Sequence, residues 1–334
     1  MVKKIVFFNN KGGVGKTTMV YHTAYMMAEL GKKVLVADLD PQANLSSMFL
    51  TQERLEEVFL IENNKLTITD VIQPVVDAEP YQEVHVEPIN SINNSLFNNN
   101  ISLIIGNLAL SIYEDKLSDA WTKCINGDVY AFKVVSLFNK ILTDAARRVQ
   151  ADYILIDVGP NLGAINRSVL ISSDYVIIPV ASDLFSLQGI KNLGKTLSVW
   201  QDQWDERKTK NPKTNSFSLP EGVMQPVGYI AMQHSAKESR PVKAYLKWAN
   251  RIPQTYREYV LHQSTPTDIK IEDDPNCLGM LRHYHSLMPM GMEARKPIFL
   301  LKPADGAIGA HYQAVLKVYQ EFKQLTEKIM SVCQ

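Results

Sequence analysis

Short runs of consecutive apolar residues recur along the chain and alternate with segments of helical periodicity. Because these runs are apolar at consecutive rather than alternate positions, they are typical of strands buried on both faces. Strands of this kind between helices predict an α/β fold with a mostly parallel sheet flanked by helices. The clearest runs are Ile5–Phe8, Val34–Ala37, Leu103–Ile105, Tyr153–Ile156, Tyr175–Val180 and Val227–Ala231.

Two helices can be placed from the spacing of their apolar residues. The first follows the first strand, between Thr17 and Leu30, and Gly31 stands where helices commonly end. The second lies near the end of the chain, where apolar residues recur every three or four positions from Val315 to Ile329. Its other face mixes lysines with glutamates, which gives little attraction to anionic lipid, so we expect this helix to pack on the protein's own sheet.

Two polar segments interrupt the alternation of strands and helices. Residues 90–100 form an asparagine-rich tract inside a longer insertion at about 51–150. Residues 204–222 are rich in charge, proline and glycine, and we expect a long exposed connection there. Since no strand motif is repeated, we expect a single domain over residues 1–334 that carries these additions, with a two-domain division as the alternative.

Composition narrows the class of protein. Lys+Arg and Asp+Glu number 35 each, so the formal net charge is zero and any contact with nucleic acid must come from a local patch. The three cysteines, Cys124, Cys277 and Cys333, show no CxxC spacing, which argues against a disulfide framework or a thiolate metal site. With no long apolar stretch and no leader before the first strand, we expect a cytoplasmic protein without a membrane partner.

The residues from Asn10 to Thr18 read NKGGVGKTT and lie between a predicted strand and a predicted helix. This is the setting of a P-loop, in which glycines let the backbone N–H groups face phosphate oxygens at the positive end of the helix. Lys16 can then reach the β- and γ-phosphates, and the Thr17 hydroxyl can coordinate Mg²⁺. The first glycine of the common P-loop pattern is replaced here by Asn10.

Lys11, at the second position of the loop, has no local partner for its charge. With it, the segment Lys11–Thr18 resembles the deviant Walker A loop of the ParA/MinD group of ATPases. The resemblance implies a P-loop NTPase fold with insertions, a dimer that forms on ATP binding, and a Lys11 that reaches the ATP of the other protomer. A solvated lysine is the alternative. The implied ATP-binding residues are Lys11, Gly12, Gly13, Val14, Gly15, Lys16, Thr17 and Thr18.

Three aspartates follow strands in the order that the resemblance requires. Asp38 and Asp40 end the strand in VLVADLDPQ, at the edge of the sheet where open α/β folds bind ligands. Asp40 resembles the family's water-positioning aspartate and Asp38 is a candidate for the Mg²⁺ shell, with capping of the next helix as the alternative for both. Asp157 matches the Walker B carboxylate, which together with Thr17 would hold magnesium. After it, Gly159 and Pro160 stand in place of the family's two prolines, and we expect this change to loosen or re-aim the turn.

The resemblance covers residues 2–50 and 151–200 well and residues 293–313 moderately. The strand end in residues 228–235 lies near where relatives contact adenine. A basic and aromatic segment between Lys243 and Tyr259 predicts either a DNA-facing surface or a solvated amphipathic helix. Cys277, His283 and His285 share one segment but lack a fourth ligand at a recognised spacing, so we do not expect a metal there.

The function expected from the resemblance is that of a slow, Mg²⁺-dependent ATPase switch of the ParA type. Lys11, Lys16 and Asp40 would be the catalytic residues. Such a switch positions or segregates DNA or another large cargo, with an adaptor or cargo protein as partner and non-specific DNA as a further one. The alternative is a regulatory or sensor subunit that recruits a partner protein without DNA. An amidoligase-like biosynthetic enzyme is a third reading, disfavoured because no second-substrate site accompanies the loop.

Overall fold

One central sheet organises the part of the chain that the computed structural model describes, residues 2–61, 64–89, 100–212, 217–232, 247–264, 268–282, 284 and 286–334. Within these residues the sheet has eight strands in the order β3-β4-β2-β5-β1-β6-β7-β8, all parallel except β3. The mostly parallel sheet predicted from the apolar runs is therefore confirmed. The strands are β1 (Lys3–Phe7), β2 (Val34–Leu39), β3 (Glu87–Pro88), β4 (Ile101–Ile104), β5 (Tyr153–Val158), β6 (Tyr175–Ala181), β7 (Gln225–Met232) and β8 (Cys277–Leu281).

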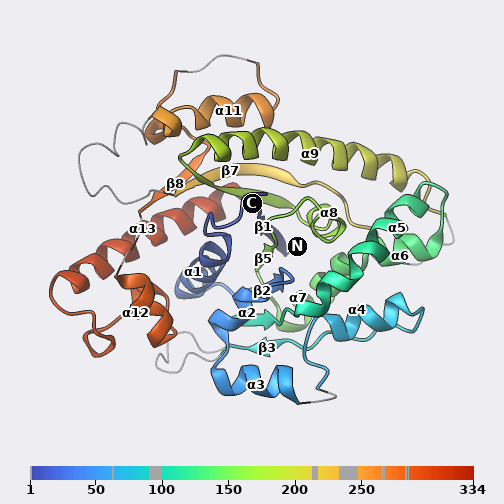
Figure 1. Cartoon of the computed structure of the whole chain (residues 1–334), viewed down its shortest axis with the longest axis horizontal. Coiled ribbons are helices and arrows are strands. Elements are labelled where there is room, and N and C mark those ends of the chain that lie inside the picture. The colour runs from blue at the N-terminus through green and yellow to red at the C-terminus, as the bar shows by residue number, and fades with distance from the viewer. Residues whose placement is uncertain are drawn as a thin grey trace.

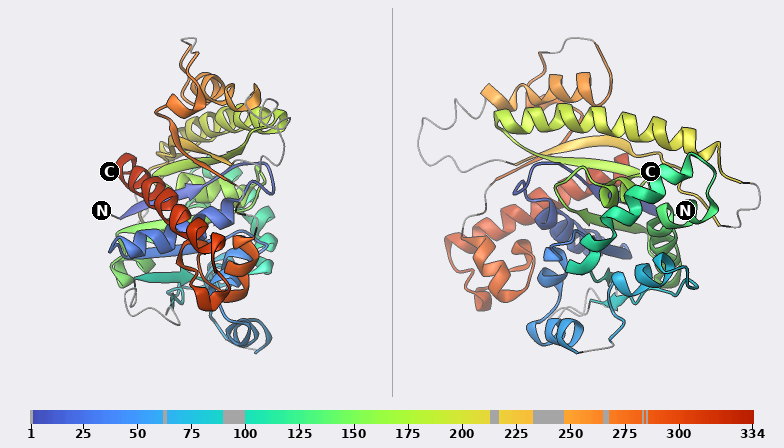
Figure 2. Two further views of the ribbon diagram at one scale, coloured as in Figure 1. Left: turned by 90° about the vertical axis from the view of Figure 1, so that its left-hand side faces the viewer. Right: turned by 45° about the vertical axis from the view of Figure 1, so that its right-hand side comes forward.

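Helices cover both faces of the sheet (Figure 1). One face carries α1 (Lys16–Glu29), α2 (Asn44–Phe49), α12 (Leu287–Ala294) and α13 (Ala310–Val332). The other carries α4 (Thr69–Val76), α5 (Glu114–Cys124), α6 (Val129–Val135), α7 (Leu137–Val149), α8 (Ala164–Ile171), α9 (Leu184–Lys208) and α11 (Ile252–Tyr259). Turning the molecule shows α13 and the helices α5–α7 on opposite sides of the sheet (Figure 2). None of the helices in the described ranges is long and apolar enough to cross a bilayer.

Both helices predicted from apolar spacing are present. The helix α1 ends at Glu29, just before Gly31, whose φ of +78° lies in the left-handed region that glycine adopts without strain. In α13 the predicted apolar face is buried, including Val315, Phe322 and Ile329, and it packs against α1 and β8. Packing on the protein's own sheet is therefore confirmed for this helix.

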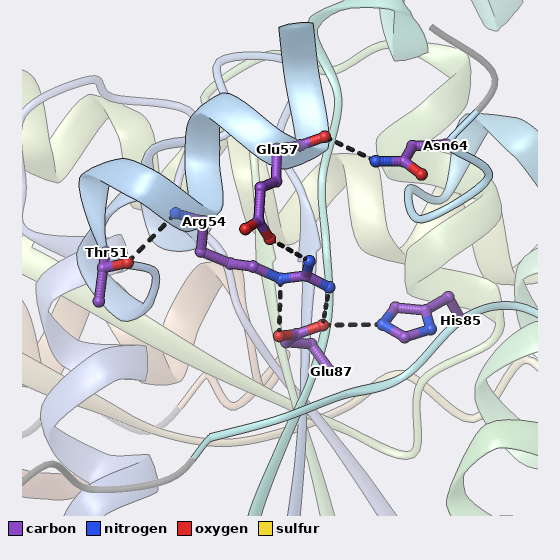
Figure 3. A network of polar contacts seen from close by, with 6 residues as sticks. All are labelled: Thr51, Arg54, Glu57, Asn64, His85 and Glu87. Atoms are coloured by element: carbon purple, nitrogen blue, oxygen red, sulfur yellow. Dashed lines mark hydrogen bonds and ion pairs between the residues drawn. The ribbon is translucent and has the colours of Figure 1, made fainter. Parts of the chain in front are cut away.

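The segment predicted as an insertion supplies part of the sheet as well as peripheral helices. Its β4 pairs with β2, and its α7 packs on β5. Its outer helix α3 (Gln52–Leu60) is tied to the sheet by Arg54, whose guanidinium donates to both carboxylate oxygens of Glu87 at 3.0 and 2.8 Å (Figure 3). Burial alone raises the pKa of Glu87, but Arg54 and His85 hold it below its usual value. Residues 90–99 of the asparagine-rich tract lie outside the described part.

The prediction of an exposed connection from residue 204 onward is wrong at its start. The helix α9 continues to Lys208, so Trp204 falls on the same face as Trp200 and is fully buried. The Trp204 ring stacks on Trp121 at 5.7 Å, and its indole N–H donates to the Pro220 carbonyl at 2.9 Å. The charged residues around Trp204 are the solvent face of a helix rather than a loop. Residues 213–216 lie outside the described part.

Four short 3₁₀ helices complete the described secondary structure. They lie mostly in the connections near the ends of the sheet. They are η1 (Leu108–Tyr113), η2 (Ile271–Asp273), η3 (Ile298–Leu300) and η4 (Pro303–Asp305).

Candidate active site

The glycine-rich loop joins the end of β1 to the start of α1. Gly13 and Gly15 have φ values of +72° and +83°, a backbone conformation that other residues adopt only with strain. Lys16 is the first residue of α1, and its side chain is largely buried. Burial lowers the pKa of Lys16, while the carboxylates of Asp157 and Asp40 oppose that shift. The lysine predicted to bind phosphate therefore lies near two of the three predicted aspartates.

Asp38 and Asp157 face each other across neighbouring strands at the carboxyl ends of β2 and β5, where they are register partners. Both side chains have no exposed surface. Among the described residues, neither oxygen of Asp157 has a hydrogen-bond partner, nor does Oδ1 of Asp38. Burial raises the pKa of Asp157 to about 8 and that of Asp38 to about 7. The charge of Asp38 adds to the shift of Asp157, and the charge of Asp40 adds to the shifts of both.

This pair of aspartates fits a divalent cation. Unpaired buried carboxylates are costly, and hard cations such as Mg²⁺ take oxygen ligands directly or through water. Thr17, predicted as the direct ligand, lies close enough to Asp157 for its hydroxyl to lower the pKa of that carboxyl. Asp157, Asp38 and Thr17 would therefore hold the metal or its water shell.

Asp38 has a second role that the strand pattern did not reveal. Its Oδ2 accepts hydrogen bonds from the backbone N–H and the hydroxyl of Ser46, both at 2.7 Å, in the first turn of α2. The Ser46 hydroxyl in turn accepts from the Gly106 N–H at 2.9 Å. One oxygen of Asp38 thus caps a helix, as the alternative interpretation held, while the other has no hydrogen-bond partner in the described part of the chain. Ser46 was not predicted because it is eight residues from Asp38 and belongs to no motif.

Asp40 is the third carboxylate at this edge, just beyond the end of β2. Its side chain is mostly buried, and its Oδ1 accepts from the Gln42 N–H at 2.9 Å. A Cβ atom added at Gly159 would lie 3.3 Å from the same oxygen, so the turn after the Walker B strand packs closely on Asp40. A Cβ atom added at Gly12 would lie 3.9 Å from Pro160. The altered Gly159–Pro160 turn therefore lies between Asp40 and the phosphate loop.

Lys11 bonds within its own protomer to the start of α9. Its Nζ lies 2.5 Å from Asp183 Oδ2 and 3.4 Å from the Ser186 hydroxyl. The same Asp183 caps α9, because its Oδ1 accepts from the Ser186 N–H at 2.8 Å. Although burial opposes it, Lys11 and Ser186 keep the pKa of Asp183 below its ordinary value. The predicted free lysine has a partner that lies 172 residues away in the sequence.

Two further residues of the site were not predicted. Asn9 is fully buried, and its amide spans the base of the loop, since Nδ2 donates to the Pro179 carbonyl at 2.6 Å and Oδ1 accepts from the Lys11 N–H at 3.0 Å. Glu114, at the start of α5, accepts from the backbone N–H groups of Ala164 and Ile165 at the start of α8. No motif marks Asn9 or Glu114, so the polar side chain of each was the only sign in the sequence of a role in the site. Both hold backbone that flanks the three aspartates.

The C-terminal segment with moderate resemblance packs on the phosphate-loop helix through His22. Its Nδ1 lies 2.8 Å from the Thr18 carbonyl, and its Nε2 lies 3.2 Å from the Ile298 N–H. The ring accordingly donates from Nδ1 and accepts at Nε2, and burial lowers its pKa to about 4. At the other end of the loop, a Cβ atom added at Gly15 would lie 3.2 Å from Met232 Cε, at the end of β7. Residues 233–235, also assigned to the adenine side, lie outside the described part.

Within residues 247–259, the described part of the predicted basic and aromatic segment, the side chains do not form one continuous exposed face. Tyr256 is fully buried, and Arg257 pairs at 2.7 Å with the buried Asp274. The side chains of Lys247 and Arg251 lie over the Trp248 ring at 5.3 and 5.0 Å. Lys243, Tyr245, His283 and His285 lie outside the described residues, and Cys277 is buried on β8.

Comparisons with known proteins place the chain among nucleotide-dependent ATPases. A family model described as an AAA domain matches residues 2–210. The sporulation initiation inhibitor protein Soj of Bacillus subtilis is 28% identical over 202 residues, 60% of this chain and 67% of that protein. The chromosome-partitioning ATPase Soj of Treponema pallidum is 30% identical over 197 residues, 59% of this chain and 64% of that protein.

Solved structures show the same fold over nearly the whole chain. A protein of Corynebacterium diphtheriae gives a TM-score of 0.68 at 23% identity and covers 99% of each chain. A putative plasmid partition protein of Borrelia burgdorferi, solved with AMPPNP bound, gives 0.56 at 18% identity and covers 99% of this chain and 98% of its own. The chain therefore shares its overall fold with these two structures.

Proposed function

Since the chain belongs to the ParA/MinD-type family of P-loop ATPases, we propose that it binds Mg²⁺·ATP, dimerises around two nucleotides and hydrolyses ATP slowly. The main support is the group of buried carboxylates beside Lys16. Asp157 and Asp38 together leave three oxygens without partners among the described residues, next to a largely buried ammonium group. This arrangement suits a metal-bound triphosphate.

The phosphate loop and the three aspartates would then divide the work of hydrolysis. The backbone N–H groups of residues 12–18 bind the phosphates, and Lys16 stabilises the charge that develops on the γ-phosphoryl group. Asp40 accepts a hydrogen bond from the attacking water and orients it in line with the bond that breaks. When bound, Mg²⁺ neutralises phosphate charge, and Thr17, Asp38 and Asp157 are the residues that would hold it. The altered turn at Gly159 sets how tightly Asp40 is held.

Dimerisation is proposed from the surface around the loop. Leu184 and Phe185, directly after the partner of Lys11, are 46% and 74% exposed, and Leu162, in the turn after Asp157, is 39% exposed. Apolar groups so close to a charged loop favour burial against a second copy. Lys11 of the partner subunit would then reach the triphosphate, which requires Lys11 to leave Asp183.

Lys11→Ala tests the assignment of this lysine to the second protomer. We expect the variant to bind a fluorescent ATP analogue normally, to stay monomeric with a non-hydrolysable analogue and to lose most turnover. In the unmodified chain, turnover per protomer should rise with protein concentration because the lysine is supplied by a second copy. Full turnover by a monomeric Lys11→Ala protein would contradict the proposal.

For the biological role, we propose positioning or segregation of DNA or a large cargo, with an adaptor or cargo protein as partner. The proposal rests on the family, since the relatives include chromosome-partitioning ATPases. The alternative is a regulatory subunit that recruits a protein without DNA. It is supported by the ion pair that Arg257 forms with Asp274 and by the zero net charge of the chain. A gel shift of Asp40→Ala with ATP on random-sequence duplex over a salt series separates them, because ATP-dependent retention that weakens with salt requires phosphate contacts.

A further inference from the structure

A cavity of about 840 Å³ lies at the opposite edge of the sheet from the phosphate loop. It is lined by Lys4 at the start of β1, by residues along α6 and α7, and by residues that precede β6 and β7. Lys4 and Asn9 are separated by five residues of extended chain, or roughly 16 Å. The cavity is therefore separate from the nucleotide site, although β1 contributes to both. Its volume is within the range of pockets that bind small organic molecules.

Two polar side chains that line this cavity, Lys4 and Ser136, carry the argument for a ligand. The Lys4 ammonium donates to Asn139 Oδ1 at 2.6 Å, and among the described residues no carboxylate lies within ion-pairing distance of it. Burial lowers the pKa of Lys4, against the opposing charges of Asp174 and Glu221. The Ser136 hydroxyl, in a residue that is 2% exposed, has no hydrogen-bond partner in the described part of the chain. A buried hydroxyl without a partner, like that of Ser136, is rare in folded proteins.

The remaining walls of the cavity define what could occupy it. Leu137, Ile171 and Leu219 supply apolar surface. Lys140 and Arg147 line it as well, but both pair with Asp144, at 2.9 and 3.6 Å. Asp174 also lines it, and its Oδ2 already accepts from the Lys4 backbone N–H at 2.8 Å. Lys133, Thr143, Ser218 and Glu221 also line the cavity. The Lys4 ammonium and the Ser136 hydroxyl are therefore two of several polar groups that face a mainly apolar space.

We propose that this cavity is a second binding site, which takes a small organic anion with an apolar body and one carboxylate or phosphate group. The anionic group lies against the Lys4 ammonium and the Ser136 hydroxyl, and the apolar body packs on Leu137, Ile171 and Leu219. Hydrogen bonds to a charged group stabilise a complex by about 1.5–3 kcal/mol, so Lys4 should contribute at least about tenfold in affinity. The site does not depend on the proposed ATPase cycle.

Titration calorimetry of the full chain tests the site. Phenylacetate and phenyl phosphate serve as the two anionic probes and 2-phenylethanol as the neutral reference, all with a non-hydrolysable ATP analogue present so that the phosphate loop is occupied. We expect saturable one-to-one binding of at least one anion and weaker binding of the alcohol. Which anion binds more tightly decides between the carboxylate and the phosphate class. Failure of both anions to bind, or equal binding of the alcohol, would overturn the proposal.

Three variants locate the binding to these residues. Lys4→Met keeps the length of the side chain and should weaken the anion about tenfold or more. Ser136→Ala removes only an unpartnered hydroxyl, so it should fold normally and still bind the anion less tightly. Lys3→Met is the matched control, because Lys3 is adjacent in β1 but does not line the cavity and lies 6.0 Å from the Tyr175 ring centre. If Ser136→Ala and Lys3→Met bind the anion equally well, the assignment is wrong.

Discussion

Lys11 and Asp183 join the phosphate loop to the first turn of α9 by an ion pair of 2.5 Å. The two side chains are 31% and 35% exposed, so solvent screens the attraction, and exposed pairs of this kind contribute at most about 1 kcal/mol. A triphosphate offers a stronger partner for the ammonium. The pair is thus strong enough to position Lys11 in the single protomer and weak enough to release it.

Replacing Asp183 by Asn tests this balance, and the test rests on the proposed dimer. Asparagine still caps α9 through its side-chain oxygen but carries no charge for Lys11. We expect dimerisation with a non-hydrolysable ATP analogue at a severalfold lower protein concentration, measured by sedimentation, and a change in stability of at most about 1 kcal/mol. Weaker dimerisation would mean that Asp183 itself contacts the second copy.

Ser46→Ala should lower the free energy of unfolding by roughly 1–3 kcal/mol. The substitution leaves the buried Asp38 carboxylate with one hydrogen bond fewer and removes the acceptor of the Gly106 N–H. Urea unfolding measures the loss. Ser47→Ala is the matched control, because Ser47 is exposed and its hydroxyl only donates to the Asn44 carbonyl, so its effect should stay within about 0.5 kcal/mol. If Ser46→Ala and Ser47→Ala lowered the free energy of unfolding equally, the stabilising role assigned to the Ser46 hydroxyl would be wrong.

Because of the low pKa of His22, we expect the free energy of unfolding to fall as the pH is lowered from 6.5 to 4. Its folded pKa of about 4 lies below the unfolded value near 6.5, so the unfolded chain binds the proton first. The contribution of His22 to the free energy of unfolding is fully present above pH 6.5. It is lost as the pH drops toward 4, by roughly 3 kcal/mol over that range. In His22→Phe, urea unfolding at several pH values should show a shallower slope between pH 6.5 and 4. An unchanged slope would assign the acid sensitivity to other groups.

Gly194→Ala should destabilise the packing of α9 on α11. An added Cβ would overlap the Tyr259 carbonyl oxygen, so one of the two helices must move. Alanine favours a helix over glycine by about 1 kcal/mol, but overpacking of this kind costs roughly 1–3 kcal/mol, and we expect a net loss. Thermal unfolding measures it, with Lys195→Ala on the exposed face as control. A more stable Gly194→Ala protein would contradict the close approach.

The local features of the site could be predicted from the sequence, whereas its long-range partners could not. The loop from Lys11 to Thr18 and the strand ends at Asp40 and Asp157 follow from chain order, since a parallel sheet places the carboxyl ends of its strands at one edge. The pairing of Lys11 with Asp183 depends on how α9 packs, and no spacing along the chain encodes it. Nothing in the sequence separates Ser46, whose N–H and hydroxyl donate to Asp38, from any other serine.

The fold was predicted wrongly at two segments whose local composition does not suggest the buried structure that they form. Trp204 stands among charged residues that read as a loop, but these residues occupy one side of a 25-residue helix whose other side is buried. The strand β8, residues 277–281, was missed because it is short and contains Gly279, which weakens the strand pattern. In both places the tertiary packing outweighs the local preference.

Glu114 lies in the segment 51–150 that was predicted as an insertion, yet its carboxylate accepts from the first turn of α8, a few residues after Asp157. A chimeric protein that received residues 51–150 from a relative without this glutamate would leave two amide groups of that turn unpaired. In such a chimera, residues 51–150 and the turn after Asp157 therefore have to be transferred together.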